Sequence, residues 1–166
     1  DPTSGGRHDY RGPLEADLDL ASFSPNALVA IGEEAALQGH LLVLSFALAV
    51  AERLGAETAS DLGLAQLAGA GGVAAGRLSA ALGEGEGLAR VASVLRLHPL
   101  LRPSGYVAVD VHLDEECDRL VLLLGECPAL RESLARSWPQ LLVAAGSAGD
   151  KALAAVARGV DARCDA

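Results

Sequence analysis

The amino-acid sequence predicts an α+β domain in which a helix-rich N-terminal half packs on a small antiparallel β-hairpin, with further helices at the C-terminal end. Two observations lead to this class. Sequence rich in Ala and Leu, and compatible with helix, runs from residue 26 to residue 97. After it, residues 106–113 alternate in side-chain character, and an apolar run at 120–124 follows an acidic interruption at 114–116. A period of two bounded by turn residues is typical of a hairpin.

Composition limits the kind of protein this can be. The 166 residues are enough for one domain with an ample core. With 51% hydrophobic residues but only 3% aromatics and no Met, that core is built from Leu, Val and Ala. A net charge of −9 without a basic stripe predicts no nucleic-acid partner. Three cysteines without CxxC spacing favour a reduced, cytoplasmic protein, and no cofactor is predicted.

The start of the chain differs from the rest. Residues 1–23 are polar and rich in Gly, Pro and Asp, which predicts an arm that is either flexible or laid over the domain surface. Residues 24–166 are predicted to form a single domain. The first residue is Asp1, so either an initiator Met has been removed or the domain is part of a longer protein.

Ser24 and Pro25 predict the start of the first helix, over residues 26–54, because Ser is a favoured N-cap and Pro suits the first helical position. Gly55 supplies the stop. The longest apolar run, around residues 41–51, is too short to span a bilayer. Because this stretch is nearly all apolar, we expect other elements to surround it. The sequence therefore predicts that residues 26–54 form a buried core helix and that the protein does not bind a membrane.

A second helix is predicted over residues 56–82 and a third over 86–97. The middle of the second helix, residues 69–76, is unusually rich in glycine. Glycine costs roughly 1 kcal/mol per interior helix position relative to alanine. That cost is tolerable where another backbone or a ligand approaches closely, and a kink or break at Gly71-Gly72 is the alternative.

The remaining elements follow the same logic. Residues 98–103 are predicted to form a loop that leads into the hairpin. An apolar piece at 138–145 and a last helix at 148–159 come after it, and residues 160–164 have the character of the start of a further strand.

His40, within the first helix, is the first candidate for chemistry. Glu33 lies seven residues earlier, so both fall near one helix face. A carboxylate would fix the tautomer of the imidazole and raise its pKa. On this hypothesis His40 and Glu33 are catalytic candidates, with Gln38 and Ser45 nearby as ligand-binding residues. The favoured alternative is a core or partly exposed histidine whose hydrogen bonds are satisfied.

Cys127 is the third catalytic candidate. It follows a strand and precedes Pro128, at a sheet edge where functional groups are often held rigidly. The favoured alternative is a small buried hydrophobe, since only Arg131 is close enough in sequence to lower the thiol pKa. Gly72 and Trp138 complete the predicted ligand-binding set, Gly72 by allowing close approach and Trp138 by stacking. For Trp138 a core anchor is the favoured alternative.

Four residues near the hairpin could in principle supply zinc ligands, namely His98, His112, Cys127 and Cys164. No two of them have the short local spacing typical of structural zinc sites, so no metal is predicted. His112 is more simply an outward-facing strand residue, with Asp110 available on the same face.

The order of these parts can be compared with known families. The sequence runs from Ala75-Gly76-Arg77-Leu78 through a hairpin that closes on Glu126-Cys127-Pro128 to a Trp-Pro element and a helix leading to residues 160–164. This order resembles the bacterial proteins grouped around L-2-amino-thiazoline-4-carboxylic acid hydrolase. The resemblance covers most of residues 25–166 in layout, with Cys127 and Cys164 as the matching residues, and it implies a shared fold and a hydrolase-like activity. In that group another Cys tends to lie between these two, where this chain has Ser137-Trp138-Pro139-Gln140.

Two functions are therefore open. The first is a domain that binds a small molecule between its helices and its sheet, with a hydrolase-like or biosynthetic enzyme as one form of it. The second is a non-catalytic interaction module of a larger protein that forms a homodimer through the Gly/Ala-rich face of residues 69–76. Convergence of Glu33, His40 and Cys127 on one cavity would favour the first.

Overall fold

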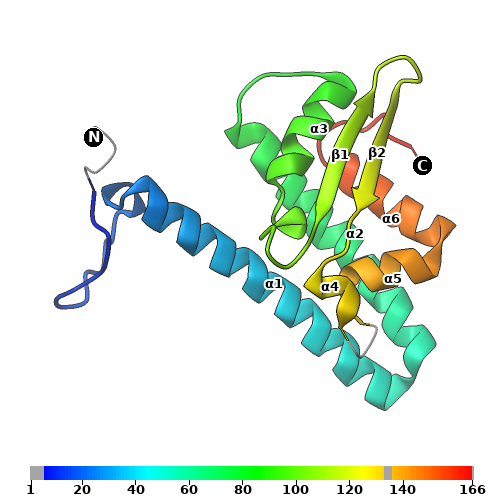
Figure 1. Ribbon diagram of the computed structural model, residues 1–166, viewed down its shortest axis with the longest axis horizontal. Helices are drawn as coiled ribbons and strands as arrows, with labels where there is room; N and C mark the ends of the chain where they lie inside the picture. Colours follow the sequence, from blue (N-terminus) through cyan, green and yellow to red (C-terminus); the bar gives the residue numbers. More distant parts are fainter. Residues whose placement is uncertain (1–5, 133–135, 166) are drawn as a thin grey trace.

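The computed structural model describes residues 6–132 and 136–165 and confirms the α+β class. Helices occupy both ends of the chain, and a two-stranded antiparallel sheet lies between them (Figure 1). The elements are the 3-10 helix η1 (Leu20–Ser22), the helices α1 (Pro25–Leu54), α2 (Ala56–Ala81) and α3 (Gly87–Leu97), the 3-10 helix η2 (Pro99–Leu101), the strands β1 (Val109–Asp114) and β2 (Arg119–Leu124), and the helices α4 (Pro128–Arg131), α5 (Trp138–Ala145) and α6 (Ser147–Ala157).

Helix α1 begins and ends where the sequence predicts. The side chain of Ser24 accepts a hydrogen bond from the backbone N–H of Ala27 at 3.3 Å, and Gly55 ends the helix with a φ of 92°. The C-terminal half of α1 contacts α2, η2 and α5. Its N-terminal half extends beyond the rest of the molecule and carries the arm at its far end (Figure 1).

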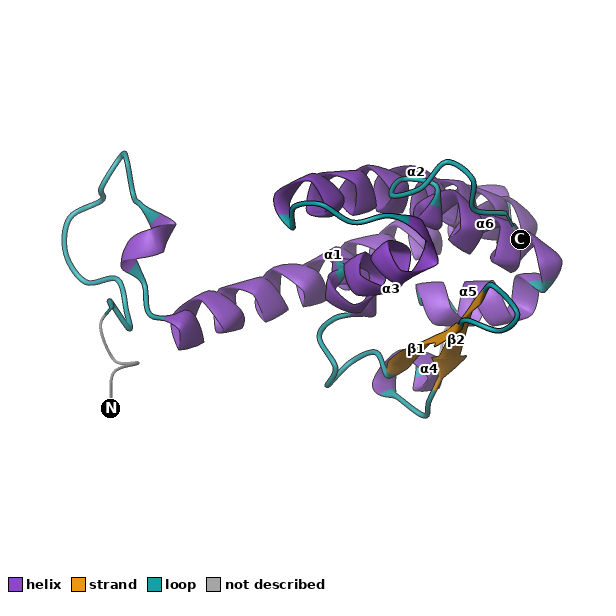
Figure 2. Ribbon diagram, turned by 90° about the horizontal axis from the view of Figure 1, so that it is seen from above, coloured by secondary structure: helices purple, strands orange, loops and turns teal. Residues whose placement is uncertain are grey.

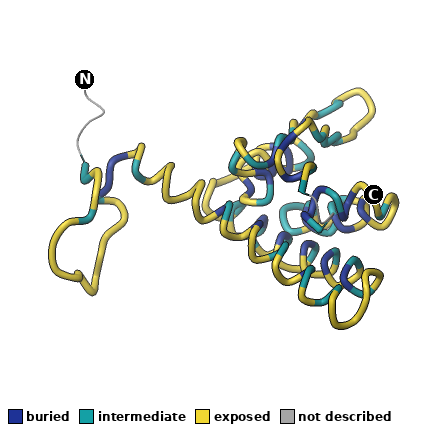
Figure 3. Tube along the Cα trace, turned by 60° about the horizontal axis from the view of Figure 1, so that its bottom comes forward, coloured by how far each residue is buried: buried dark blue, intermediate teal, exposed yellow. Residues whose placement is uncertain are grey.

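The prediction that other elements surround α1 is wrong. Only Ala36, His40 and Ala47 are buried along its length, while Leu42 keeps 64% of its surface exposed (Figure 3). The reason is geometric, because α2, η2 and α5 reach one face of α1 and nothing in the described chain reaches the opposite face. Within the described residues, α1 is also the one helix long and apolar enough to cross a membrane, which by itself is weak evidence for a span.

Helix α2 runs without a break through its glycine-rich middle. Close approach, and not a break in the helix, explains Gly71, Gly72 and Gly76, whereas a Cβ on Gly69 would meet open space. A Cβ on Gly72 would lie 3.2 Å from the carbonyl oxygen of Ala155, and one on Gly159 would lie 2.1 Å from that of Gly72. Helix α6 and the turn after it therefore pack directly on the backbone of α2. The face that contains Gly72 and Gly76 is covered within one chain and is not open to a second copy.

The hairpin has the predicted position and a regular register, from Val109 opposite Leu124 to Asp114 opposite Arg119. One face packs against the helical layer (Figure 2) and buries Val111. The opposite face carries Asp110 and His112 in solvent, as the alternation predicts. The sheet and the helices share one core, whose most buried members include Val91, Val94, Val107 and Val156.

Two further expectations change. The apolar piece at 138–145 is a helix, α5, which begins with a capping box between Ser137 and Gln140. Residues 160–164 form turns and not a strand.

The described part of the arm is attached to the start of α1. Arg7 exchanges backbone hydrogen bonds with Ser22 and Ser24 at 2.9 Å, so this part of the arm does not cover the domain body.

Candidate functional site

His40 is buried and belongs to an aromatic cluster at the junction of α1, η2 and α5. Its Nε2–H donates to the backbone carbonyl of Arg102 at 2.5 Å. Its ring centroid lies 5.3 Å from that of Tyr106 and 6.3 Å, in stacked orientation, from that of Trp138. Burial lowers the pKa of His40, and the backbone carbonyls of Arg102 and Pro99 oppose this only in part. The imidazole is therefore held as a neutral donor.

Glu33 does not orient this histidine, contrary to the sequence hypothesis. Glu33 lies in the projecting, exposed half of α1, before the helix reaches the domain body. Seven residues place two side chains near the same face of a helix, but the buried face of α1 begins only at Ala36. The partner of His40 is a backbone carbonyl 62 residues further along the chain, which no sequence spacing could identify.

Tyr106 links His40 to Cys127. The Tyr106 hydroxyl donates to Oε1 of Glu132 at 3.2 Å. Burial, followed by the charge of Glu132, raises the pKa of Tyr106 to about 12, and the nearby Cys127 adds to that shift. Cys127 is free and buried. His40 and Cys127 are thus both buried and both near Tyr106.

The predicted ligand-binding residues are spread over the molecule. Gln38 and Ser45 are exposed on α1, and Gly72 packs against α6. Trp138 is buried and lines a shallow hollow of about 150 Å³ between α5, α6 and the sheet, and its indole N–H has no hydrogen-bond partner within the described chain. These four residues do not form one site.

His98 has a structural role, because both of its ring nitrogens form hydrogen bonds inside the protein. Its Nε2–H donates to the carbonyl of Gly71 at 3.0 Å, and its Nδ1 accepts from the backbone N–H of Leu100 at 3.1 Å. Both ring nitrogens are therefore used, which fixes the neutral tautomer, and burial lowers the pKa of His98. The two histidines hold the two ends of the η2 segment, His98 at its start and His40 at its end.

The other residues considered for zinc do not gather. His112 Nε2 lies 2.8 Å from a carboxylate oxygen of Asp110 on the outer face of the sheet. Across residues 6–132 and 136–165 no group of three or more His, Cys, Asp or Glu side chains is placed to hold a metal ion. Cys164 is free and half-buried in the turn after α6.

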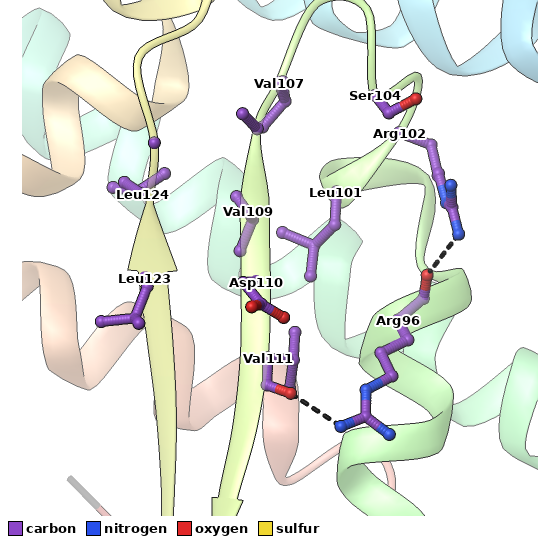
Figure 4. A pocket seen from close by; sticks show the side chains of 12 residues that line it. Arg96, Leu101, Arg102, Ser104, Val107, Val109, Asp110, Val111, Leu123 and Leu124 are labelled. Atoms are coloured by element: carbon purple, nitrogen blue, oxygen red, sulfur yellow. Dashed lines mark hydrogen bonds between the residues drawn. The ribbon is translucent and has the colours of Figure 1, made fainter.

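A groove of about 550 Å³ runs along the edge of β1 that does not pair with β2, between that strand and the α3–η2 segment (Figure 4). Its lining is mostly apolar and includes Leu101, Val109, Leu123 and Leu124. Such a volume lies within the range of small-molecule sites. None of the sequence-predicted site residues lines it.

Two arginines mark the α3–η2 side of this groove. Arg96 donates to the carbonyl of Val111 at 2.8 Å, and Arg102 donates to the carbonyl of Arg96 at 3.1 Å (Figure 4). Each of these contacts uses one terminal nitrogen, while a guanidinium has five N–H donors. Among the lining residues the only carboxylate is that of Asp110, and one of its oxygens lies 2.8 Å from Nε2 of His112. The groove therefore combines an apolar floor with a cationic side in a protein of net charge −9.

The groove was missed because its parts come from separate segments. Arg96 and Arg102 flank the segment His98-Pro99-Leu100-Leu101, directly before the hairpin. Two basic residues near a hairpin in an acidic chain are a usable signal, but their joint position depends on His40 holding the Arg102 backbone from a distant helix.

Comparison with known proteins identifies no protein similar to this chain. No protein-family model, no curated protein and no solved structure matches this chain. The fold and the groove therefore define the class by themselves: a helix-rich α+β domain with a candidate binding groove at a sheet edge. The likeness to the thiazoline carboxylate hydrolases stays a prediction.

Proposed function

We propose that this domain binds a small anionic molecule with an apolar body in the groove along β1, between the helices and the sheet. The observation that carries the proposal is the groove itself, with apolar walls and the guanidinium groups of Arg96 and Arg102 on one side. An arginine suits a carboxylate or phosphate because its planar donors match two acceptor oxygens at once. An aliphatic or aromatic body would replace water along Leu123 and Leu124.

Binding is favoured over turnover by what lines the groove. Its lining includes Ser104 and Asp110 but no His and no Cys. A serine nucleophile needs an adjacent base within hydrogen-bond reach. His40 is instead a positioning residue, because it acts through the Arg102 backbone. Hydrolase-like chemistry at His40 and Cys127 stays a prediction, and unchanged turnover in His40→Ala and Cys127→Ala variants would remove it. The proposal places the protein in the cytoplasm, where its three free cysteines would stay reduced.

The test uses octanoate as the anionic probe and 1-octanol as its uncharged counterpart, with binding followed by isothermal titration calorimetry. We expect octanoate to bind and Arg102→Gln to weaken that binding about tenfold, the effect of losing one charge-assisted contact. Arg77→Gln, an exposed arginine on α2 outside the groove, is the matched control and keeps wild-type affinity. Equal binding of octanol and octanoate, or an unchanged affinity in Arg102→Gln, would contradict the anionic specificity.

A further inference from the structure

We infer that the exposed face of α1 is the interface of an antiparallel homodimer. Seven residues at spacings of three and four define this face, and all are exposed. They are Leu28, Ile31, Ala35, Gln38, Leu42, Phe46 and Ala49, called here the α1 stripe. Residues three and four apart lie on one side of a helix, so the stripe is continuous over about 32 Å.

The stripe is apolar in all but one of its positions and lies away from the domain body. The residues that α1 buries, Ala36, His40 and Ala47, occupy the opposite side of the helix. Leu42 and Ile31 keep 64% and 45% of their surface exposed. A contiguous apolar face of this size on a soluble domain marks an interaction surface.

The projecting half of α1 gives the second observation. Residues 28–35 are exposed all round, including Val29 on the side away from the stripe (Figure 3). A helix without tertiary contacts is marginal in water, since most helical stability in proteins comes from packing of an apolar face. A partner along the stripe would supply that packing.

The stripe is complementary to itself when a second copy runs antiparallel. With the two-fold axis between Gln38 and Gly39, Leu28 of one copy faces Ala49 of the other. Ala35 then faces Leu42, so that large side chains meet small ones, the arrangement that fills an interface without voids. Ile31 packs against Phe46 in the same register. The surface patch is the same in both copies, as a two-fold dimer requires.

A parallel pair fits less well. It would place Leu42 against Leu42, where the side chains would be crowded. It would also place Ala35 against Ala35, where a gap would remain. It would also bring the Glu34 side chains of the two copies together. In the antiparallel pair the projecting half of each α1 lies against the half of its partner that is anchored on a domain body.

A bilayer is a poorer occupant of this face. Helices that lie in a membrane interface are rich in Lys and Arg on the polar side, which attract anionic lipid. In α1 the only basic residue is Arg53, whereas Glu33, Glu34 and Glu52 are exposed. A membrane-spanning α1 would also have to release the hydrogen bond of His40 and the contacts with α2. No stripe residue lines the groove, so this inference is independent of the proposed function.

The first experiment is sedimentation equilibrium of the whole chain. We expect the wild type to be a dimer and Leu42→Glu to dissociate about 100-fold more readily, because a carboxylate would be buried unpaired opposite Ala35. Val73→Glu is the matched control: Val73 is 58% exposed on α2, away from the stripe, and its variant stays dimeric. Circular dichroism checks that both variants keep the helical content of the wild type. A monomeric wild type, or an undiminished dimer in Leu42→Glu, overturns the inference.

The second experiment tests the direction of the pair. In the double variant Ala35→Lys/Leu42→Glu, an antiparallel dimer places each new lysine opposite a new glutamate of the other copy, so the dimer returns. A parallel dimer would place like charges together and stay apart, which would overturn the antiparallel register. Co-sedimentation of the wild type with phosphatidylcholine/phosphatidylglycerol vesicles, lost in Leu42→Glu but not in Val73→Glu, would assign the stripe to a membrane instead.

Discussion

The two long helices of this domain pack on each other but use their sequences in opposite ways. Helix α1, of 30 residues, is rich in Leu and leaves much of its apolar surface exposed. Helix α2, of 26 residues, is rich in Gly and Ala and is contacted by α1, α5 and α6. Burial in this protein therefore follows how closely a backbone can be approached, and not how hydrophobic the helix is.

The difference has a simple physical origin. Where α2 lacks side chains, the α6 turn reaches its backbone, and the contact of Gly159 with the Gly72 carbonyl leaves no room for a Cβ. Along α1 no described element packs on the side opposite the domain body, and on the packed side small residues again occur at Ala36 and Ala47. Close packing gains many weak dispersion contacts that a long exposed side chain does not make.

The largest expected effect comes from breaking the backbone contact of α2. Gly159→Ala places a Cβ against the Gly72 carbonyl oxygen, a backbone atom that cannot rotate away. We expect the free energy of unfolding to fall by about 3 kcal/mol, at the upper end of overpacking costs, measured by urea denaturation. Gly69→Ala is the matched control, since its Cβ would meet open space. It should raise the stability by about 0.5–1 kcal/mol through helix propensity. Equal stability of the two variants would show that α6 does not pack on α2 as described.

A smaller effect should separate the two sides of α1. Ala47 is fully buried, so Ala47→Leu overfills the packed side of α1 and should lower the free energy of unfolding by about 1–3 kcal/mol. Leu41 is 46% exposed and lies beside the stripe, so Leu41→Ala should change stability by less than about 0.5 kcal/mol. Thermal unfolding of both variants in one buffer is the measurement. If Leu41→Ala cost more than Ala47→Leu, the assignment of the buried side would be reversed.

Much of the fold could be predicted because its signals are local. Caps and stops mark both ends of α1, and a period of two marks the hairpin, so the elements fall within a few residues of their predicted places. Burial could not be predicted, since apolar content says that a helix can be covered but not that the chain has enough elements to cover it. The 30 residues of α1 exceed what the elements packed against it can reach.

The groove could not be predicted from the sequence for a similar reason, and none of the predicted site residues lines it. His40 and Cys127 were singled out from their local context, and both lie at Tyr106. The groove depends on Arg96 and Arg102 meeting the edge of β1, which requires tertiary knowledge of η2. Sequence spacing can relate residues on one element, such as Glu33 and His40, but says nothing of a carbonyl donated by a distant loop.

The smallest expected effect concerns the buried histidines, one on α1 and one held against α2. Burial lowers the pKa of both His40 and His98 below the usual 6.5, so the unfolded chain binds protons before the folded one as the pH falls. The folded state therefore loses stability as the pH drops below about 6.5, and the loss continues down to the folded pKa values. Urea denaturation at a series of pH values from 7.5 to 5 measures this slope.

A His98→Gln variant separates the contribution of His98, which contacts α2, to the pH dependence of stability from that of His40 on α1. The glutamine side chain can still donate to the Gly71 carbonyl but takes up no proton in this range, so the pH slope should become shallower while the stability at neutral pH falls only modestly. His40 contributes to the remaining slope, and its imidazole resonances in an NMR titration should move only below pH 6.5. An unchanged slope in His98→Gln would mean that His98 has the same pKa in the folded and the unfolded chain. In that case burial against α2 would not disfavour the charged imidazole, and the lowered pKa of His98 would be wrong.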